Sequence, residues 1–442
     1  MIVNTAIMKK VTIKIKKLGL IRDSEVTIKP MMIFSGDSGL GKTYTALLSN
    51  YIFELMTSPV RLNKIFKDHS ISLPELLPKA HSEQGAFITI EKADFVTWIN
   101  EDAVDYLGYM LNYRSIDADV SMVLPLPASG LSYRYTYRNE GISSDEQKRL
   151  VIHLNNSLSY TMSDASENVD EESKLAYLTR FYLVQQIMGD FKALRSNYIM
   201  PPSRGAILTE EVNGKTGLYI EFINKFKDIN TAKAEKPDIP EKLMSELTEI
   251  LEGRVYKEEA SYMYETRGDT IPISAAASSI RELAPLTMYL SNVDISTAAI
   301  LMEEPEAHLH PLKQRMMGDV LSMMVSSKAI VQITTHSDYL LKRLNELIAL
   351  YNLKGKISAE QYSDLSAKLK VEDWMLLDPN NVNGYYLRRR ADGSVEILQQ
   401  DTSMKIPFNS FSEALQKNLS AHYALDETLQ ALTQEDEDVE QA

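Results

Sequence analysis

Three short apolar runs stand out along the chain as candidates for buried strands. They are residues 31–34 (MMIF), residues 299–302 and residues 329–335. A strand that is largely apolar on both faces is typical of a parallel sheet covered by helices on its two sides. Ligands of such sheets bind at the carboxyl ends of the strands, so the polar residues that follow each run are the first candidates for a functional site.

The rest of the pattern predicts a mixture of helices and strands. Residues 9–17 alternate between apolar side chains and lysines, which predicts a half-buried strand with a lysine face. A second short strand is expected at residues 24–28. Helical spacing occurs over residues 47–57, 92–112, 173–190 and 273–290 and again from Pro311, and a strand pair is expected at residues 132–138 and 149–154.

Two later regions are mixed. Residues 215–257 predict a strand, a helix and a second strand, followed by a hairpin within residues 258–272. After residue 355 the pattern predicts a small sheet with a hairpin at Asp392–Gly393. The expected fold class is therefore α/β, a mixed sheet with flanking helices, a long and mainly helical insertion, and a small C-terminal α+β segment.

The chain divides into five segments on this reading. Residues 1–50 and 198–354 are expected to form two parts of one domain, separated by the insertion at residues 51–197. Residues 355–430 are the C-terminal α+β segment. Residues 431–442 form an acidic tail, which we expect to be disordered because its charges repel one another and it has little to bury.

Residues 36–43 read GDSGLGKT and fit the phosphate-binding P-loop pattern at every fixed position. The glycines let backbone N–H groups wrap a phosphate, Lys42 reaches the β- and γ-phosphates, and the Thr43 hydroxyl ligates Mg²⁺. An apolar strand precedes the loop and a helical pattern follows it, as the motif requires. ATP and Mg²⁺ are thus the expected cofactors, and the expected nucleotide-binding residues are Gly36, Asp37, Ser38, Gly39, Leu40, Gly41, Lys42 and Thr43.

The two other apolar runs lead to candidate catalytic groups. Residues 299–302 run into Glu303 and Glu304, and residues 329–335 are followed by His336. A lone histidine at a strand end is more often structural than functional. Beside a P-loop, however, two acids and a histidine at strand ends favour a phosphate-hydrolysing site.

Two further segments carry groups that suit phosphate. Ser278 and Ser279 open the helical pattern that continues to residue 290, and hydroxyls with free N–H groups at a helix start can bind an anion. A plain capped helix is the alternative. Arg204 follows a strand end and a double proline, which suits a phosphate sensor, although an exposed arginine in a turn fits equally well.

Composition narrows the class of protein. The chain has 442 residues and no cysteine, which excludes disulfides, thiolate nucleophiles and cysteine zinc sites and fits a reducing cytoplasm. No run approaches the ~18 apolar residues that a membrane helix needs. The net charge of −14 argues against a surface broadly coated by nucleic acid.

In their order along the chain these motifs resemble a known family. The P-loop, a long insertion, a serine-bearing helix, EEPEAHLHP at residues 303–311 and TTHSDYLL at residues 334–341 resemble the ABC/SMC-like ATPases of the OLD (overcoming lysogenization defect) type. These are relatives of the SMC and RecF heads. The resemblance covers residues 8–50 and 198–430 and implies an ABC-type P-loop ATPase head.

The resemblance also implies roles for the catalytic groups. Glu303 takes the Walker B position that steadies Mg²⁺, and Glu304 is the base that orients the attacking water. His336 is the switch histidine that contacts the γ-phosphate, with Lys42 as the P-loop lysine. Other residues would act across a dimer: Ser278 and Ser279 would reach a neighbour's γ-phosphate, and Glu306, His308 and His310 would face the other protomer.

This chain departs from the family pattern in several places. The signature lacks its glycines, with Ile280 where one is expected, so turnover is expected to be slow or dependent on a partner. No aromatic residue clearly precedes the P-loop to stack on adenine. The family's glutamine loop has four candidates, Gln84, Gln147, Gln185 and Gln186. No TOPRIM nuclease module follows the ATPase, which predicts a separate effector.

The first functional hypothesis is an ATPase subunit of bacterial anti-phage defence. It would act as a sensor or scaffold that holds a toxic effector nuclease and releases it on a phage-encoded trigger. It would form homo-oligomers from ATP-sandwich dimers, of which a hexamer is one example, without a membrane partner.

Two other hypotheses remain. An SMC/RecF-like repair ATPase would clamp DNA between dimerised heads, using the lysine face of residues 9–17 and the arginines at 388–390. A metal-dependent hydrolase would use Glu306, His308 and His310, but ligands two residues apart need a third group from elsewhere.

Overall fold

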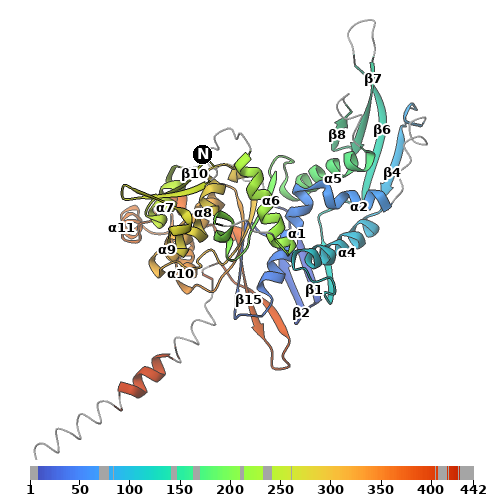
Figure 1. The fold of residues 1–442 in the computed structure, drawn as a ribbon. Helices are drawn as coiled ribbons and strands as arrows, with labels where there is room; N and C mark the ends of the chain where they lie inside the picture. The colour runs from blue at the N-terminus through green and yellow to red at the C-terminus, as the bar shows by residue number, and fades with distance from the viewer. Residues whose placement is uncertain are drawn as a thin grey trace, which may run out of the picture.

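The computed structural model describes most of the chain, drawn as a ribbon in Figure 1. The predicted acidic tail at residues 431–442 lies outside the described residues. The structure describes residues 8–68, 79–82, 84–140, 147–162, 170–209, 214–231, 241–259, 261–403, 405–406, 416, 418–426 and 428.

A nine-stranded mixed sheet forms the centre of the molecule, and its strand order is β5-β1-β2-β16-β15-β3-β14-β13-β9. Strands β9, β13, β14, β3 and β15 are mutually parallel, whereas β1 pairs antiparallel with β2 and β5. The predicted mixed α/β fold is confirmed. The strands are β1 (Thr12–Leu18), β2 (Ile21–Thr27), β3 (Met31–Gly36), β5 (Ala118–Val123), β9 (Ser196–Met200), β13 (Ala298–Glu303), β14 (Ile330–Thr334), β15 (Val382–Arg389) and β16 (Val395–Gln400).

The helices cover both faces of this sheet. They are α1 (Lys42–Thr57), α2 (Pro59–Asp68), α4 (Lys92–Met110), α5 (Glu171–Met188), α6 (Gly217–Thr231), α7 (Glu241–Leu251), α8 (Ser278–Leu290), α9 (Pro311–Ser326), α10 (Asp338–Leu353) and α11 (Ala359–Leu369). Among the described helices, none is long and apolar enough to cross a membrane.

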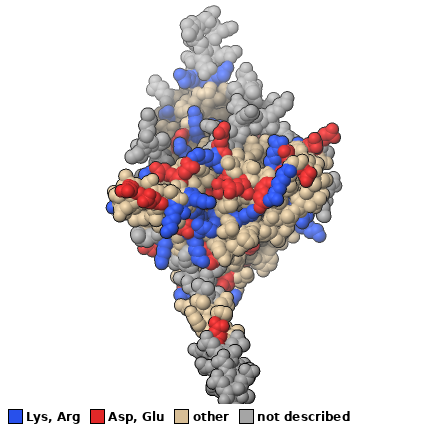
Figure 2. All heavy atoms as spheres, turned by 90° about the vertical axis from the view of Figure 1, so that its left-hand side faces the viewer, with Lys and Arg blue, Asp and Glu red and all other residues tan. Residues whose placement is uncertain are grey.

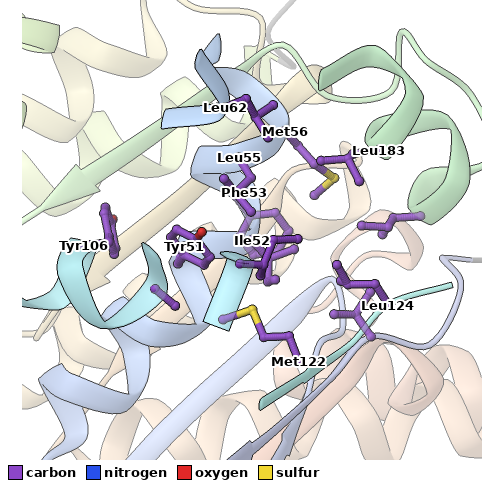
Figure 3. Packing of buried hydrophobic residues seen from close by; sticks show 14 of the residues in the cluster. Tyr51, Ile52, Phe53, Leu55, Met56, Leu62, Tyr106, Met122, Leu124 and Leu183 are labelled. Atoms are coloured by element: carbon purple, nitrogen blue, oxygen red, sulfur yellow. The ribbon is translucent and has the colours of Figure 1, made fainter. Parts of the chain in front are cut away.

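Two hydrophobic cores form on opposite faces because successive side chains of a strand point to opposite sides. Met32 and Phe34 of β3 belong to the core that contains α1, α4 and α5. Met31 and Ile33 belong to the core that contains α7 to α10. Figure 3 shows part of the first core around α1, with Tyr51, Ile52, Phe53, Leu55, Met56, Leu62, Tyr106, Met122, Leu124 and Leu183 labelled.

The pairing of β13, β14 and β3 places the ends of these three buried strands level with one another. Glu303 of β13 pairs with Thr334 of β14, and Thr334 pairs with Phe34 of β3. All three strands are buried along their whole length. The segments that follow them therefore leave the sheet at the same edge.

The insertion contains more strand than the sequence predicted. A second sheet has the order β4-β6-β7-β8 and extends to one side of the molecule beyond α2 and α5 (Figure 1). Its strands are β4 (Ala86–Ile90), β6 (Leu131–Glu140), β7 (Gln147–Leu154) and β8 (Leu158–Thr161). Only β6 and β7 were expected, and β5, which also lies within residues 51–197, joins the main sheet instead.

The C-terminal region also differs from the prediction. Residues after 355 were expected to form a small sheet of their own, but β15 and β16 enter the main sheet between β3 and β2. The Tyr385 hydroxyl contributes by bonding the backbone N–H and C=O of Thr27, at 2.7 and 2.8 Å. A strand hairpin does not reveal its long-range partner in local sequence, so this placement was not predictable from the pattern.

A strand predicted within residues 215–257 is absent from the described part of that region. Helix α6 takes its place because Phe222, Phe226 and Ile229 recur at helical spacing and pack into one core. A third sheet follows, formed by β10 (Arg254–Glu258), β11 (Ser261–Thr266) and β12 (Asp269–Pro272). The predicted hairpin is the β11–β12 pair.

Glu246 of α7 gives the fold a testable pH dependence. Burial, and then the charge of Asp319 in α9, raise the pKa of Glu246 from 4.5 to about 7. A raised carboxyl pKa favours the folded state at low pH, and this stability is lost as pH rises through about 7. We therefore expect Glu246→Gln to raise the free energy of unfolding by about 1–2 kcal/mol near pH ~8 and to change it little near pH ~5.

Urea unfolding at both pH values measures this difference, and Glu360→Gln, at an exposed position of α11, is the control. An equal effect of Glu246→Gln at the two pH values would contradict the assignment.

Candidate active site

The P-loop connects the end of β3 to the start of α1. Gly39 and Gly41 have φ angles of 76° and 93°, which residues with a Cβ rarely adopt. At Gly36 a Cβ would lie 2.4 Å from the carbonyl oxygen of Leu387 in β15. Gly36 is therefore required by the neighbouring strand as well as by the loop.

The Lys42 ammonium lies inside the loop. Its Nζ donates hydrogen bonds to the carbonyl oxygens of Gly36, at 3.0 Å, and Asp37, at 2.8 Å. Burial lowers the pKa of Lys42, and the nearby charge of Glu304 opposes that shift. The loop thus holds a cation where a P-loop lysine meets the terminal phosphates of a nucleotide.

Thr43 and Glu303 contact one another, since the threonine hydroxyl donates to Glu303 Oε2. Burial raises the pKa of Glu303, and the bond from Thr43 opposes this. The other carboxylate oxygen, Oε1, is buried without a hydrogen-bond partner in the described part of the chain. A free carboxylate oxygen beside a hydroxyl is a hard, all-oxygen donor set that fits Mg²⁺, so Thr43 and Glu303 are the residues that would hold it.

Glu304 and His336 lie side by side at the ends of β13 and β14. The Glu304 N–H donates to the Thr334 carbonyl oxygen at 3.1 Å, and Glu304 has a φ of 46°. His336 Nε2 lies 3.9 Å from Glu304 Oε1. Burial and the Lys42 charge lower the pKa of His336, with Glu304 opposing them, so a neutral imidazole that can donate one N–H is favoured near neutral pH.

One cavity of about 530 Å³ joins these groups. It is lined by P-loop residues from Ser38 to Thr43 and by Glu303, Glu304, Thr334 and His336. The remaining lining comes from Tyr44 and from the turn between β1 and β2, residues 18–21. The structure therefore brings the predicted phosphate, metal and catalytic residues into one site.

The turn at residues 18–21 was missed by sequence reasoning. Leu20 is half exposed at its tip, although the chain has ample core to bury a leucine. An apolar side chain at the rim of a phosphate site suits the flat face of a base. The only sequence signal for this was a leucine within the turn Gly19–Leu20.

The three predicted dimer-facing residues divide into two groups. His308 and His310 are exposed, and His310 also caps α9 by accepting from the Leu312 N–H at 3.4 Å. Glu306, however, points inward, where burial raises its pKa and its carboxylate accepts hydrogen bonds from Thr335 and His336. Its expected outward position is corrected, because both donors lie at the end of the adjacent strand.

These residues also form no metal centre. No group of three or more His, Asp and Glu side chains arranged for a metal occurs within the part of the chain that the structure describes. The metal-dependent hydrolase hypothesis loses its basis, since Glu306 and the two histidines point in different directions.

Arg204 does not lie where an arginine contacts phosphate directly. It is 2% exposed, and its guanidinium donates to the backbone carbonyls of Glu282, at 2.9 Å, and Glu303, at 3.0 Å. Burial lowers its pKa, and Glu282 opposes this. Arg204 therefore holds the backbone at the end of β13 from within the protein interior.

Ser278 and Ser279 lie at the first turn of α8, outside the cavity. Ser278 is exposed and Ser279 partly exposed. Gln84, Gln185 and Gln186 do not line the cavity either, and the Gln147 side chain lies outside the part of the chain that the structure describes. Completion of the site by a serine or glutamine would have to come from another protomer or from movement of the chain.

A buried amide cluster connects α1, the helix that follows the P-loop, to β9 and β14. Asn50 Nδ2 in α1 donates to Asn197 Oδ1 in β9 at 3.0 Å and to Gln332 Oε1 in β14 at 3.2 Å. The Tyr106 hydroxyl of α4 donates to Asn50 Oδ1 at 3.2 Å. Because α1 begins at Lys42 and β14 ends just before His336, the cluster fixes the two sides of the site relative to one another.

A match to one protein family agrees with this chemistry. Residues 132–341 match the family model "AAA ATPase domain", a range that contains Glu303, Glu304 and His336 but not the P-loop. No curated protein matches the chain.

Several solved structures are similar to the chain. An SMC head bound to the C-winged helix domain of ScpA has 12% identity and a TM-score of 0.36, covering 90% of this chain and 98% of that one. The SMC head domain from Thermotoga maritima has 10% identity and a TM-score of 0.34, covering 89% and 100%. An SMC head from Pyrococcus furiosus with an extended coiled coil, bound to the C-terminal domain of ScpA, has 10% identity and a TM-score of 0.34, covering 94% and 99%.

The family match and the chemistry of the cavity together support ATP hydrolysis as the activity of this chain.

Proposed function

We propose that this chain is a sensor or scaffold ATPase of bacterial anti-phage defence, which holds a separate effector nuclease and releases it on a phage-encoded trigger. The observation that carries the ATPase part is the single cavity that joins the P-loop, Glu303, Glu304 and His336. The defence role is supported by the order of motifs, which resembles OLD-type ATPases and the ATPase subunit AriA of the PARIS system.

Each group has a defined task in hydrolysis. P-loop N–H groups and Lys42 bind the β- and γ-phosphates, and Thr43 with Glu303 would hold Mg²⁺. Glu304 accepts a hydrogen bond from the water that attacks the γ-phosphorus, and the bond to the β–γ bridging oxygen breaks to give ADP and phosphate. The His336 imidazole donates to an equatorial γ-oxygen, where charge develops.

The surface around the cavity supports assembly into ATP-sandwich dimers. Leu312 is 67% exposed in the first turn of α9, and Tyr339 is 43% exposed in the first turn of α10. Leu312 lies two residues after the exposed His310, and Tyr339 lies three residues after His336. Exposed apolar side chains beside an open site suit contact with a second protomer, which would also supply the Ser278–Ser279 turn.

The DNA-clamp alternative rests on the lysines of residues 9–17 and the arginines at 388–390, but several of these cations pair with acids. Lys16 Nζ lies 3.3 Å from Asp119, and Lys17 contacts Asp117. Arg388 and Arg390 both pair with Glu396. On another face, the one that carries α11 at the left of Figure 1, Figure 2 shows acidic and basic residues lying side by side. Local pairing lowers the charge available to phosphates, so we favour the protein partner.

Two substitutions separate binding from chemistry. Lys42→Ala removes the phosphate-binding cation and is expected to weaken ATP binding at least about tenfold. Glu304→Gln leaves the P-loop intact and is expected to bind ATP normally. Its rate of hydrolysis is expected to fall at least about 100-fold. Calorimetry and phosphate release measure the two effects, with Glu360→Gln as the control. Normal hydrolysis by Glu304→Gln would contradict the role given to that carboxylate.

Mixing two inactive variants tests the shared site. Lys42→Ala damages only a subunit's own P-loop, and Ser279→Ala damages only the surface offered to a neighbour. A mixed dimer therefore retains one intact composite site, and we expect the mixture to recover a substantial part of wild-type hydrolysis. No recovery, together with a monomer by light scattering in the presence of ATP, would contradict the sandwich.

The partner is tested by binding. The defence proposal predicts a stable complex with a nuclease encoded by a neighbouring gene and weak binding to bare duplex DNA. Tight, ATP-stimulated and salt-sensitive duplex binding without a protein partner would favour the DNA clamp instead.

A further inference from the structure

The turn that follows β13 contains a third carboxylate, Glu306, which takes no direct part in the proposed hydrolysis. Glu306 is 7% exposed, and its Oε1 accepts from the Thr335 hydroxyl at 2.7 Å and from the His336 N–H at 2.8 Å. The Thr335 hydroxyl oxygen accepts in turn from the Ser337 N–H at 3.0 Å. Glu306 thus holds the backbone on both sides of the switch histidine.

Stability alone is a poor explanation for this carboxylate. Glu306 Oε2 is buried with no hydrogen-bond partner among the described residues, and a half-satisfied buried carboxylate costs free energy. The nearby charge of Glu304 also disfavours the ionised carboxylate and raises its pKa further. A smaller apolar residue would relieve both costs, so the acid is better explained by its action on His336.

The turn itself is strained. Glu304 and His308 have φ angles of 46° and 62°, which cost of order 1 kcal/mol each in residues with a side chain. Only two backbone hydrogen bonds close the turn, from Ala307 to Glu304 and from Leu309 to Glu306, at 3.0 and 3.1 Å. One end carries the water-orienting carboxylate and the other the exposed His308, with Glu306 between them.

We propose that Glu306 is the positioning residue of the switch histidine, and that it links His336 to the outward turn at His308. A displacement of this turn moves Glu304 directly and His336 through the two hydrogen bonds of Glu306. A protomer that closes over His308 would therefore adjust both catalytic groups at once. This linkage rests on the proposed two-subunit ATPase, whereas the contact between Glu306 and His336 does not.

Amide hydrogen exchange tests the contact independently of turnover. In Glu306→Ala the His336 N–H loses its acceptor, and we expect its exchange to accelerate at least about tenfold. The amides of β14, which bond within the sheet, should not change, and Glu360→Ala is the control. Glu306→Gln keeps an oxygen that accepts from the same two donors and should retain most of the protection. Unchanged exchange at His336 in Glu306→Ala would overturn the proposal.

Kinetics test the consequence for hydrolysis. We expect Glu306→Ala to lower kcat about 10- to 100-fold with KM for ATP changed less than about threefold, because the P-loop is intact. Glu306→Gln should recover most of kcat. Since the effect passes through the histidine, Glu306→Ala with His336→Ala should be no slower than His336→Ala alone.

The outcomes separate this proposal from the proposed function. Normal kcat in Glu306→Ala, or multiplying effects in the double variant, would overturn the positioning role while leaving the ATPase assignment in place. Normal kcat in His336→Ala would instead contradict the switch role of the histidine, and hydrogen exchange would still decide the contact.

Discussion

Parallel pairing of β3, β14 and β13 is the constraint on which the whole site depends. Phe34, Thr334 and Glu303 lie level in this pairing, so the segments that leave the three strands emerge at one edge. Because a slip of one residue would turn every side chain to the other face, the two hydrophobic cores fix this register. The residues of the site keep fixed relative positions because the two cores allow the three strands to pair in only one register.

Electrostatics at this edge are balanced by groups on several sides. Glu303 and Glu306 are buried, and Glu304 is half exposed between them. Lys42 faces these acids from the P-loop, and Arg204 bonds the backbone of Glu303 from behind. A site with this many carboxylates gains most from a divalent cation and a nucleotide that bring compensating charge and ligands.

Local motifs allowed the centre of the site to be predicted. The P-loop glycines and the acids and histidine at the ends of apolar runs depend on residues close in sequence, so their pattern predicts their place. Glu306 and Arg204 were predicted less well, because the direction of each depends on partners between 29 and 99 residues away. The position of β15 beside Gly36 depends on contacts between residues that lie even farther apart in the sequence.

The most direct test is a structure of the protein with Mg²⁺ and a non-hydrolysable ATP analogue. Our account predicts a nucleotide sandwiched between two protomers, its γ-phosphate within hydrogen-bond distance of His336 and of the partner's serine turn, and Glu304 facing the attacking side. A nucleotide held by one protomer alone, with Glu304 and His336 turned away from the γ-phosphate, would contradict it.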